Sequence, residues 1–345
     1  MPQSHSPSLS TTDPVLVEVT RGPLVESRHR GAAAVVDSAG HTVAAWGDVA
    51  RPVFPRSAIK ALQAIALVES GAADAFDLGP AELALACASH NGEAAHAEAV
   101  RAWLLRIDLG VDDLECGAHA PMGEEAELDL VRAGREAGAH HNNCSGKHAG
   151  MLTLAKRLGV PTAGYIAADH PVQSLVRRTV GEMAGCDLAE APAGTDGCGI
   201  PTLAMPLEAM AWAFARIADP ATLAPERAAA VRRIRAAVAA RPDMVAGRGR
   251  FCTAVMAAAG EAVFVKTGAE GVFCAALPDM GLGFALKIED GATRAAECAI
   301  AALLLGFGAA DGPGAAALTG YTDRTLRNWA GTETGTIRPA AHWPD

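Results

Sequence analysis

Three short apolar runs follow one another in residues 262–288, which read AVFVKTGAEGVFCAALPDMGLGFALKI. Residues 262–266, 272–276 and 282–288 are rich in Val, Phe, Ala and Leu, and turns containing Gly or Pro separate them. Runs of this length between turn residues are typical of β-strands. We therefore predict three strands here, followed by an apolar helix over residues 295–305.

The N-terminal part shows the same strand pattern. Residues 16–19, 31–36 and 42–46 are Val- and Ala-rich runs, with a turn at residues 37–40, and they predict a small antiparallel meander. From about residue 56 the apolar spacing becomes helical, as in Ile59, Leu62 and Ile65. We expect one α/β domain over residues 15–345. Its antiparallel sheet would combine strands from residues 15–50 and 260–290, a helical insertion would span residues 56–250, and the active site would lie at the sheet–helix boundary.

Composition narrows the functional classes. Half of the 345 residues are hydrophobic, which is enough for a sizeable core. The net charge of -10 and the lack of a basic run argue against a nucleic-acid partner. Residues 1–14 are polar and rich in Ser, Thr and Pro, so we expect a disordered tail there, with no signal peptide and no membrane span. The expected location is the cytoplasm, where the eight cysteines would stay reduced.

A serine and a lysine stand three residues apart in PRSAIK, residues 55–60, at the predicted start of a helix. Residues with this spacing share one helix face. A lysine that is desolvated enough to be neutral can take the proton of a serine, and the free backbone N–H groups of a helix start can hold an oxyanion. Ser57 and Lys60 are therefore a candidate nucleophile and base. Alone, the pattern is more typical of a solvated helix face, where Ser and Lys are common.

Two further motifs strengthen this interpretation. SHN, residues 89–91, follows a short apolar helix, and KTG, residues 266–268, ends a strand. The ordered set S-x-x-K, S-x-N and K-T-G is the signature of serine β-lactamases and penicillin-binding proteins. Ser89 would relay a proton to the leaving amine, Lys266 would set the protonation of Ser89, and Gly268 would let the strand approach the substrate. The alternative is that Ser89 caps a loop and Lys266 is an exposed charge at a strand end.

Two polar, Gly-containing loops carry cysteines. One is HHNNCSGKH, residues 140–148, and the other is TDGCGIP, residues 195–201. Two thiolates with a nitrogen ligand from His or Lys would suit zinc. The spacing matches no closed structural zinc finger, so Cys144 and Cys198 could equally be ordinary buried thiols.

Taken together, these segments resemble the Rhizobium etli type L-asparaginases over nearly the whole chain. The matching segments are VESRHRG (25–31), RSAIK (56–60), CASHNG (87–92), HNNCSGKH (141–148), DGCGIP (196–201), KTG (266–268) and the tail from NW (328–329) to IRP (337–339).

The resemblance implies a fold of the serine β-lactamase and glutaminase type, a homodimer, and two Ser–Lys tandems. The tandems fall on Ser57 with Lys60 and on Ser89 with Lys266. The resemblance also implies one zinc ion per chain, whose ligands fall on Cys144, Lys147 and Cys198. The candidate residues for shaping the substrate pocket are Arg56, Asn91, His148, Asp196 and Gly268.

The predicted function is hydrolysis of L-asparagine to L-aspartate and ammonia through an acyl-enzyme. Ser57 would attack the side-chain amide after Lys60 takes its proton, and Ser89 with Lys266 would help ammonia leave. Three alternatives stay open: a β-lactamase-like or peptidoglycan-directed serine hydrolase, a zinc hydrolase in which metal-bound water attacks, and a non-catalytic metal-binding or scaffold protein.

Overall fold

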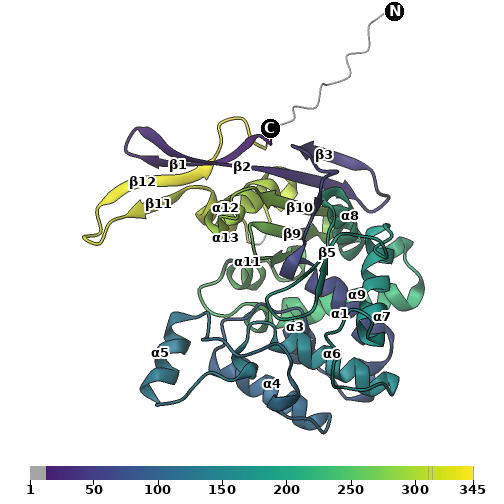
Figure 1. Cartoon of the computed structure of the whole chain (residues 1–345). Coiled ribbons are helices and arrows are strands. Elements are labelled where there is room, and N and C mark those ends of the chain that lie inside the picture. The colour runs from purple at the N-terminus through teal and green to yellow at the C-terminus, as the bar shows by residue number, and fades with distance from the viewer. Residues whose placement is uncertain (1–12, 310, 313, 345) are drawn as a thin grey trace, which may run out of the picture.

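An eight-stranded antiparallel sheet runs through the molecule (Figure 1) in the computed structural model, which describes residues 13–309, 311–312 and 314–344. The strand order is β11-β12-β1-β2-β10-β9-β8, and β3 also pairs with β2. The strands of this sheet are β1 Val15–Arg21, β2 Leu24–Asp37, β3 Thr42–Trp46, β8 Phe264–Thr267, β9 Val272–Leu277, β10 Leu282–Ile288, β11 Arg324–Arg327 and β12 Glu333–Pro339.

Strand β2 joins the two ends of the chain in this sheet. Its first half pairs with β1 and alternates between exposed and half-buried or buried residues, whereas its second half pairs with β10 and β3 and is almost entirely buried. Gly31 lies where the pairing passes from β1 to β10, and a Cβ there would collide with the carbonyl oxygen of Lys287. The N- and C-terminal strands therefore share one core, as the sequence predicted.

Different helices cover the two faces of the sheet. Successive side chains of a strand point to opposite faces. At Gly283 of β10 a Cβ would collide with the backbone of helix α8, Leu207–Ala218, whereas Phe284 packs its ring 6.0 Å from that of Phe307, just after helix α12, Thr293–Leu304. The small Ala and Gly side chains of these strands allow helices to pack closely on both faces of the sheet.

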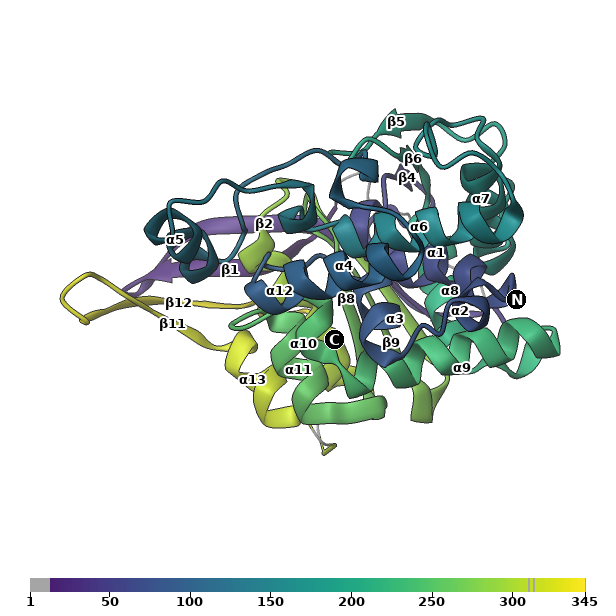
Figure 2. The same cartoon turned by 90° about the horizontal axis from the view of Figure 1, so that it is seen from below.

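The segment between β3 and β8 supplies the helical region, with two small two-stranded sheets (Figure 2). Its helices are α1 Lys60–Glu69, α2 Ala72–Ala75, α3 Pro80–Ala86, α4 Ala94–Arg106, α5 Glu124–Arg132, α6 Ser145–Leu158, α7 Pro171–Ala184, α8, α9 Pro225–Ala240, α10 Pro242–Val245 and α11 Phe251–Ala259. The small sheets pair β4 Pro52–Val53 with β7 Met205–Pro206, and β5 Ala193–Thr195 with β6 Pro201–Leu203. Helix α13 is Ala315–Thr322.

The predicted fold class is confirmed: an α/β fold with an antiparallel sheet built from N- and C-terminal strands around a helical insertion. The sequence did not predict β11 and β12, which extend this sheet beyond residue 290. Their burial is low and their sequence polar, so the apolar pattern that reveals the other strands is missing. Of the expected tail over residues 1–14, residues 1–12 lie outside the described residues, and Asp13 is buried and accepts a 2.9 Å bond from Arg51.

Strand β8 places the candidate site on the face that α8 covers. Phe264 and Lys266 point to the same face, because they are two residues apart in a strand. The ring of Phe264 packs 5.9 Å from that of Phe214 in α8. Lys266 therefore points toward the helical region, at the sheet–helix boundary where the sequence predicted an active site. No helix in the described part of the chain has both the length and the apolar character to cross a membrane.

Candidate active site

The first motif forms the start of helix α1. A 3-10 turn over Arg56–Ile59 leads directly into α1, so Ser57 precedes Lys60 by one turn. Ser57 is half-buried and Lys60 is 1% exposed. Arg56 holds a positive φ of 50°, a conformation that costs a non-glycine residue free energy and often occurs at functional sites. The segment around Ser57 is therefore strained and accessible, while the lysine is deep in the protein.

The Lys60 amine binds a different serine from the one expected. Its Nζ donates to Ala88 O at 2.5 Å, to Ser89 Oγ at 3.1 Å and to Cys144 Sγ at 3.1 Å. An ammonium group has three N–H donors, so these acceptors use them all. Within residues 13–309, 311–312 and 314–344, the Ser57 hydroxyl forms no hydrogen bond. Ser57 and Lys60, the expected pair, lie one turn apart, but no hydrogen bond joins their side chains in this conformation.

Lys266 reaches the same serine from the sheet. Its Nζ contacts Ser89 Oγ at 2.9 Å and Thr267 O at 2.7 Å. The side chain is 1% exposed, which excludes the alternative of an exposed charge at a strand end. Burial and the nearby charge of Lys60 lower the pKa of Lys266 from 10.5 to about 7. The expected Ser89–Lys266 pair is thus present, with Ser89 Oγ lying between two lysine amines.

Two backbone N–H groups at this contact, that of Ser57 itself and that of Ala269, are available as donors. Gly268, which follows β8, packs so closely on the start of α1 that a Cβ there would lie 2.9 Å from Pro55 O and 3.1 Å from Ala58 N. In the described part of the chain, the backbone N–H groups of Ser57 and Ala269 have no hydrogen-bond acceptor. Glycine at 268 therefore brings the strand end against the helix start, and both segments offer donors for an oxyanion.

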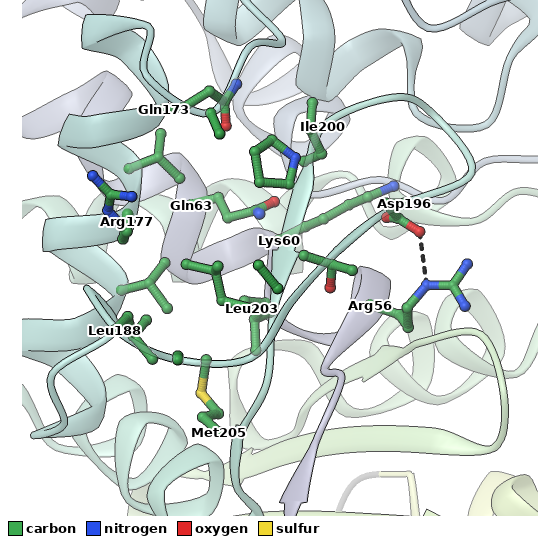
Figure 3. A pocket seen from close by; sticks show the side chains of 18 of the residues that line it. Arg56, Lys60, Gln63, Gln173, Arg177, Leu188, Asp196, Ile200, Leu203 and Met205 are labelled. Atoms are coloured by element: carbon green, nitrogen blue, oxygen red, sulfur yellow. Dashed lines mark hydrogen bonds and ion pairs between the residues drawn. The ribbon is translucent and has the colours of Figure 1, made fainter.

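Arg56 and Asp196 form an ion pair beside this site (Figure 3). Arg56 Nε donates to Asp196 Oδ1 at 2.7 Å, and the Asp196 side chain is 9% exposed. Burial by itself would raise the pKa of Asp196, but the charges of Lys147 and Arg56 outweigh burial and lower it. The pair connects the start of α1 to the loop that carries Cys198.

Asn91 and His148, the other two expected substrate residues, make contacts within the protein. Asn91 Nδ2 donates to Glu93 Oε1 at 3.1 Å and to Arg248 O at 3.0 Å, and its Oδ1 accepts from Arg250 Nη1 at 2.9 Å. His148 is fully buried, with its Nδ1 2.6 Å from the hydroxyl of Tyr165. Asn91 therefore has its amide groups occupied, and His148 has one ring nitrogen bonded to Tyr165.

The expected zinc ligands lie together. Lys147 Nζ is 2.9 Å from Cys198 Sγ, and the thiol of Cys198 hydrogen-bonds Cys144. All three side chains are at most 5% exposed. The bond from Cys198, opposed by burial and helped by the charges of Lys147 and Lys60, lowers the pKa of Cys144 well below its usual value. Two sulfur atoms and an amine that converge in this way fit a zinc ion.

Lysine is essential to this donor set. In the described residues, no group of three or more His, Cys, Asp or Glu side chains is placed to hold a metal ion. Burial tends to lower the pKa of Lys147, but Cys144 and Cys198 raise it overall, so the amine must lose a proton before it can bind a metal. The residues thus fit zinc only if Lys147 acts as the third ligand.

Sequence reasoning missed a hydrogen-bond chain that fixes the serine loop. His90 is fully buried; its Nδ1 accepts from Gly92 N at 3.1 Å, so its Nε2 donates to Ser145 Oγ at 2.9 Å. Ser145 follows Cys144, so this bond ties the Ser89 loop to the thiol loop. His90 and Ser145 both lie within the motifs already noted, and their place in those motifs was the only indication of this bond in the sequence.

By its family the chain is a hydrolase, and its site holds a buried serine between two lysines at the boundary of the sheet and the helices. More narrowly, the chain belongs to the L-asparaginase II family, which it matches over residues 17–339.

The chain is also similar to two solved structures, at low sequence identity. A β-lactamase from Mycobacterium bovis is 16% identical, with 77% of this chain and 89% of that chain covered and a TM-score of 0.39. A β-lactamase-like protein from Bacteroides dorei is 14% identical, with 75% and 84% covered and a TM-score of 0.42. No curated protein sequence matches this one.

Proposed function

We propose that the chain hydrolyses the side-chain amide of L-asparagine to L-aspartate and ammonia through a serine acyl-enzyme. The observation that carries this proposal is the placement of Ser89 Oγ between Lys60 Nζ at 3.1 Å and Lys266 Nζ at 2.9 Å. Such an arrangement can move a proton between a nucleophile and a leaving amine without a histidine. Membership of the L-asparaginase II family supports the choice of amide.

Ser57 is the proposed nucleophile because it is the accessible serine. Ser57 is half-buried, and its hydroxyl has no hydrogen-bond partner among the described residues. Ser89 is only 5% exposed, and two lysine amines bind its hydroxyl. The backbone amides of Ser57 and Ala269 would bind the oxygen of the tetrahedral intermediate. The ester bond forms between Ser57 Oγ and the amide carbon, ammonia leaves, and water then cleaves the ester.

Lys266 is the proposed neutral amine of the pair. The expected base was Lys60, but its three N–H groups are all used by acceptors, one of which is a thiol with a lowered pKa. Lys266 has two contacts and a pKa of about 7. In this scheme Lys266 accepts a proton through Ser89 and returns it to the departing nitrogen, while the charge of Lys60 keeps Lys266 neutral.

Arg56 and Asp196 are the proposed contacts for the carboxylate and ammonium groups of asparagine. Their ion pair places one charge of each sign beside the start of α1, which matches a zwitterionic substrate. Zinc, if bound, would be held by Cys144, Lys147 and Cys198 and would supply a fixed positive charge that orients polar groups. The nucleophile in this proposal is Ser57, which needs no metal.

Ammonia release tests the proposal directly. L-Asparagine, L-glutamine and a chromogenic β-lactam would each be incubated with the wild type and with Ser57→Ala. We expect ammonia from asparagine with the wild type only. Cleavage of the β-lactam with no ammonia from asparagine would replace the proposal with a β-lactamase-like function, and turnover that survives in Ser57→Ala would exclude the acyl-serine mechanism.

We further propose a cytoplasmic homodimer, as the family resemblance implies. The tip of the β11–β12 hairpin carries a fully exposed Trp329, and Leu24 at the start of β2 is 72% exposed. Large apolar side chains on projecting hairpins are suited to contact with another chain. Light scattering would give the mass in solution, with a monomer counting against this part of the proposal.

A further inference from the structure

A segment that belongs to none of the sequence motifs, residues 245–250, holds the loop that carries Ser89. The segment runs from the last residue of helix α10 to the residue just before helix α11. Ser89 N donates to Val245 O at 2.9 Å, and Asn91 N donates to Ala246 O at the same distance. The position of the Ser89 hydroxyl therefore depends on the backbone of residues 245–250.

Side chains strengthen the same contact. Asn91 Nδ2 donates to Arg248 O at 3.0 Å, and Asn91 Oδ1 accepts from Arg250 Nη1 at 2.9 Å. At Gly247 a Cβ would lie 2.8 Å from Asn91 Nδ2, so glycine allows the segment to approach the amide. In the described part of the chain, the bond to Asn91 is the only hydrogen bond of the half-buried Arg250 side chain. The guanidinium thus serves to hold this one amide in place.

Arg250 also places a positive charge near Lys266. Burial and the charge of Lys60 are the main causes of the lowered pKa of Lys266, and the charge of Arg250 acts in the same direction. The other titratable groups near this amine are the thiols of Cys87, Cys144, Cys252 and Cys274. Burial raises the pKa of all these thiols except Cys144, whose charge opposes that of Arg250. Near Arg250 lies Glu297 of α12, a carboxyl whose pKa burial raises.

We propose that Arg250 is a positioning residue that holds Asn91 and thereby keeps the Ser89 hydroxyl between the two lysine amines. Its charge also favours the neutral Lys266 amine that the proposed function requires as a base, so this inference rests on that function. Asn91 is then a link within the protein and not a substrate contact. Because Arg250 acts through another residue, its loss should lower kcat and leave KM for asparagine nearly unchanged.

Two substitutions separate the bond from the charge. Arg250→Met removes both. A small misplacement of a catalytic group can cost about 10²-fold in rate, so kcat should fall by about 10- to 100-fold with KM within about twofold of the wild type. The midpoint of the pH profile should rise by about half a unit or more, because the guanidinium no longer repels the protonated amine. Arg250→Lys keeps the charge without the planar fork, so it should keep the midpoint and restore only part of kcat.

Arg248→Met is the matched control, because Arg248 lies two residues before Arg250 in the same segment. Its side chain is exposed and among the described residues pairs only with Glu93 and Glu125, and the substitution keeps the carbonyl that binds Asn91. It should leave kcat, KM and the midpoint unchanged. Wild-type kcat in Arg250→Met, or a rise in KM without a fall in kcat, would overturn the proposal. Arg250→Gln, a milder change that also removes the charge, gives the same comparison if the methionine variant does not fold.

Two measurements without substrate separate this inference from the proposed function. Hydrogen exchange at the amides of Ser89 and Asn91 should be faster in Arg250→Met than in Arg248→Met. Titration of lysine labelled with ¹³C at Cε, with the Lys266 signal assigned by its loss in Lys266→Met, should show a raised pKa in Arg250→Met only. Both changes without ammonia release by the wild type would refute the proposed function and support the role of Arg250. Ammonia release by the wild type, with neither change in Arg250→Met, would refute the role of Arg250 alone.

Discussion

Replacing Lys266 tests the part of the mechanism that depends most on the three-dimensional structure. Burial and the charge of Lys60 lower the pKa of Lys266 from 10.5 to about 7. At pH 8 an amine with a pKa of about 7 is roughly 90% neutral, against about 0.3% for an unperturbed lysine, so burial supplies about 300-fold more base. Arginine cannot supply a neutral amine. We therefore expect Lys266→Arg and Lys266→Met to lower kcat by about 10² to 10⁴-fold.

The same shift fixes the sign of the pH dependence. The active form is the neutral amine, so activity should be low below pH 6, rise through a midpoint near the pKa of about 7 and level off above pH 8. The rate should increase by about tenfold from pH 6 to pH 8. With an unperturbed lysine, the rate would instead keep rising toward pH 10.

The assay is initial-rate ammonia release from saturating asparagine between pH 5.5 and pH 9.5. Lys287→Arg is the control, since Lys287 lies on β10 of the same sheet, separated from β8 by β9, and among the described residues it donates only to the backbone oxygens of Glu270 and Ile288. It should keep both the rate and the midpoint. A folded Lys266→Arg with more than about a tenth of wild-type kcat, or a wild-type profile that is flat from pH 6 to pH 9, would refute a Lys266 base.

Three other predictions concern the nucleophile, the zinc site and the ion pair. Ser57→Ala should lower turnover by about 10⁴-fold or more with an unchanged Tm, measured by single-turnover ammonia release and thermal melting; residual activity of a few per cent would exclude Ser57. Elemental analysis should find about one zinc per chain, and Cys144→Ser and Cys198→Ser should both lower it while raising KM more than they lower kcat; full zinc occupancy in either variant would remove that cysteine from the ligand set. Arg56→Gly relieves the positive φ of 50° but loses the bond to Asp196, so KM for asparagine should rise about tenfold at nearly constant Tm; an unchanged KM would remove the ion pair from substrate binding.

Local pattern was sufficient for the strands and helices that bury apolar side chains. Strands β3 and β10 begin and end at the predicted residues, because each is an apolar run of residues such as Val, Ala and Leu that lies between clear turn residues. Strands β11 and β12 were missed, because segments such as RTLR are mostly exposed and show no apolar face. The pairing of β12 with β1 comes from backbone hydrogen bonds across more than 300 residues of sequence, which no local pattern reports.

The chemistry of the site was predictable residue by residue, whereas the pairing of residues was only partly so. Spacing along the helix placed Lys60 beside Ser57, but the amine turns inward to Ala88 and Ser89, because the side chain is buried and needs acceptors there. Asn91 belongs to a motif, and only the structure shows that Arg250, far along the chain, occupies its amide oxygen. Sequence identifies which groups are chemically competent, and tertiary contacts decide which partners they have.

The two buried lysines show why this distinction matters for mechanism. Both are 1% exposed, and both contact the same hydroxyl, so the residue type and the motif give no reason to assign them different roles. Their surroundings do. The Cys144 thiol, whose pKa is lowered, accepts a bond of 3.1 Å from Lys60. Among the described residues Lys266 donates only to a hydroxyl and a backbone carbonyl, and burial and the charge of Lys60 lower its pKa. Two like charges that share Ser89 in a desolvated site repel each other, and the lowered pKa of Lys266 makes it the lysine that loses its proton more readily. In the mechanism proposed above, the Cys144 thiol beside Lys60 would then help to decide which lysine acts as the base, even without a metal.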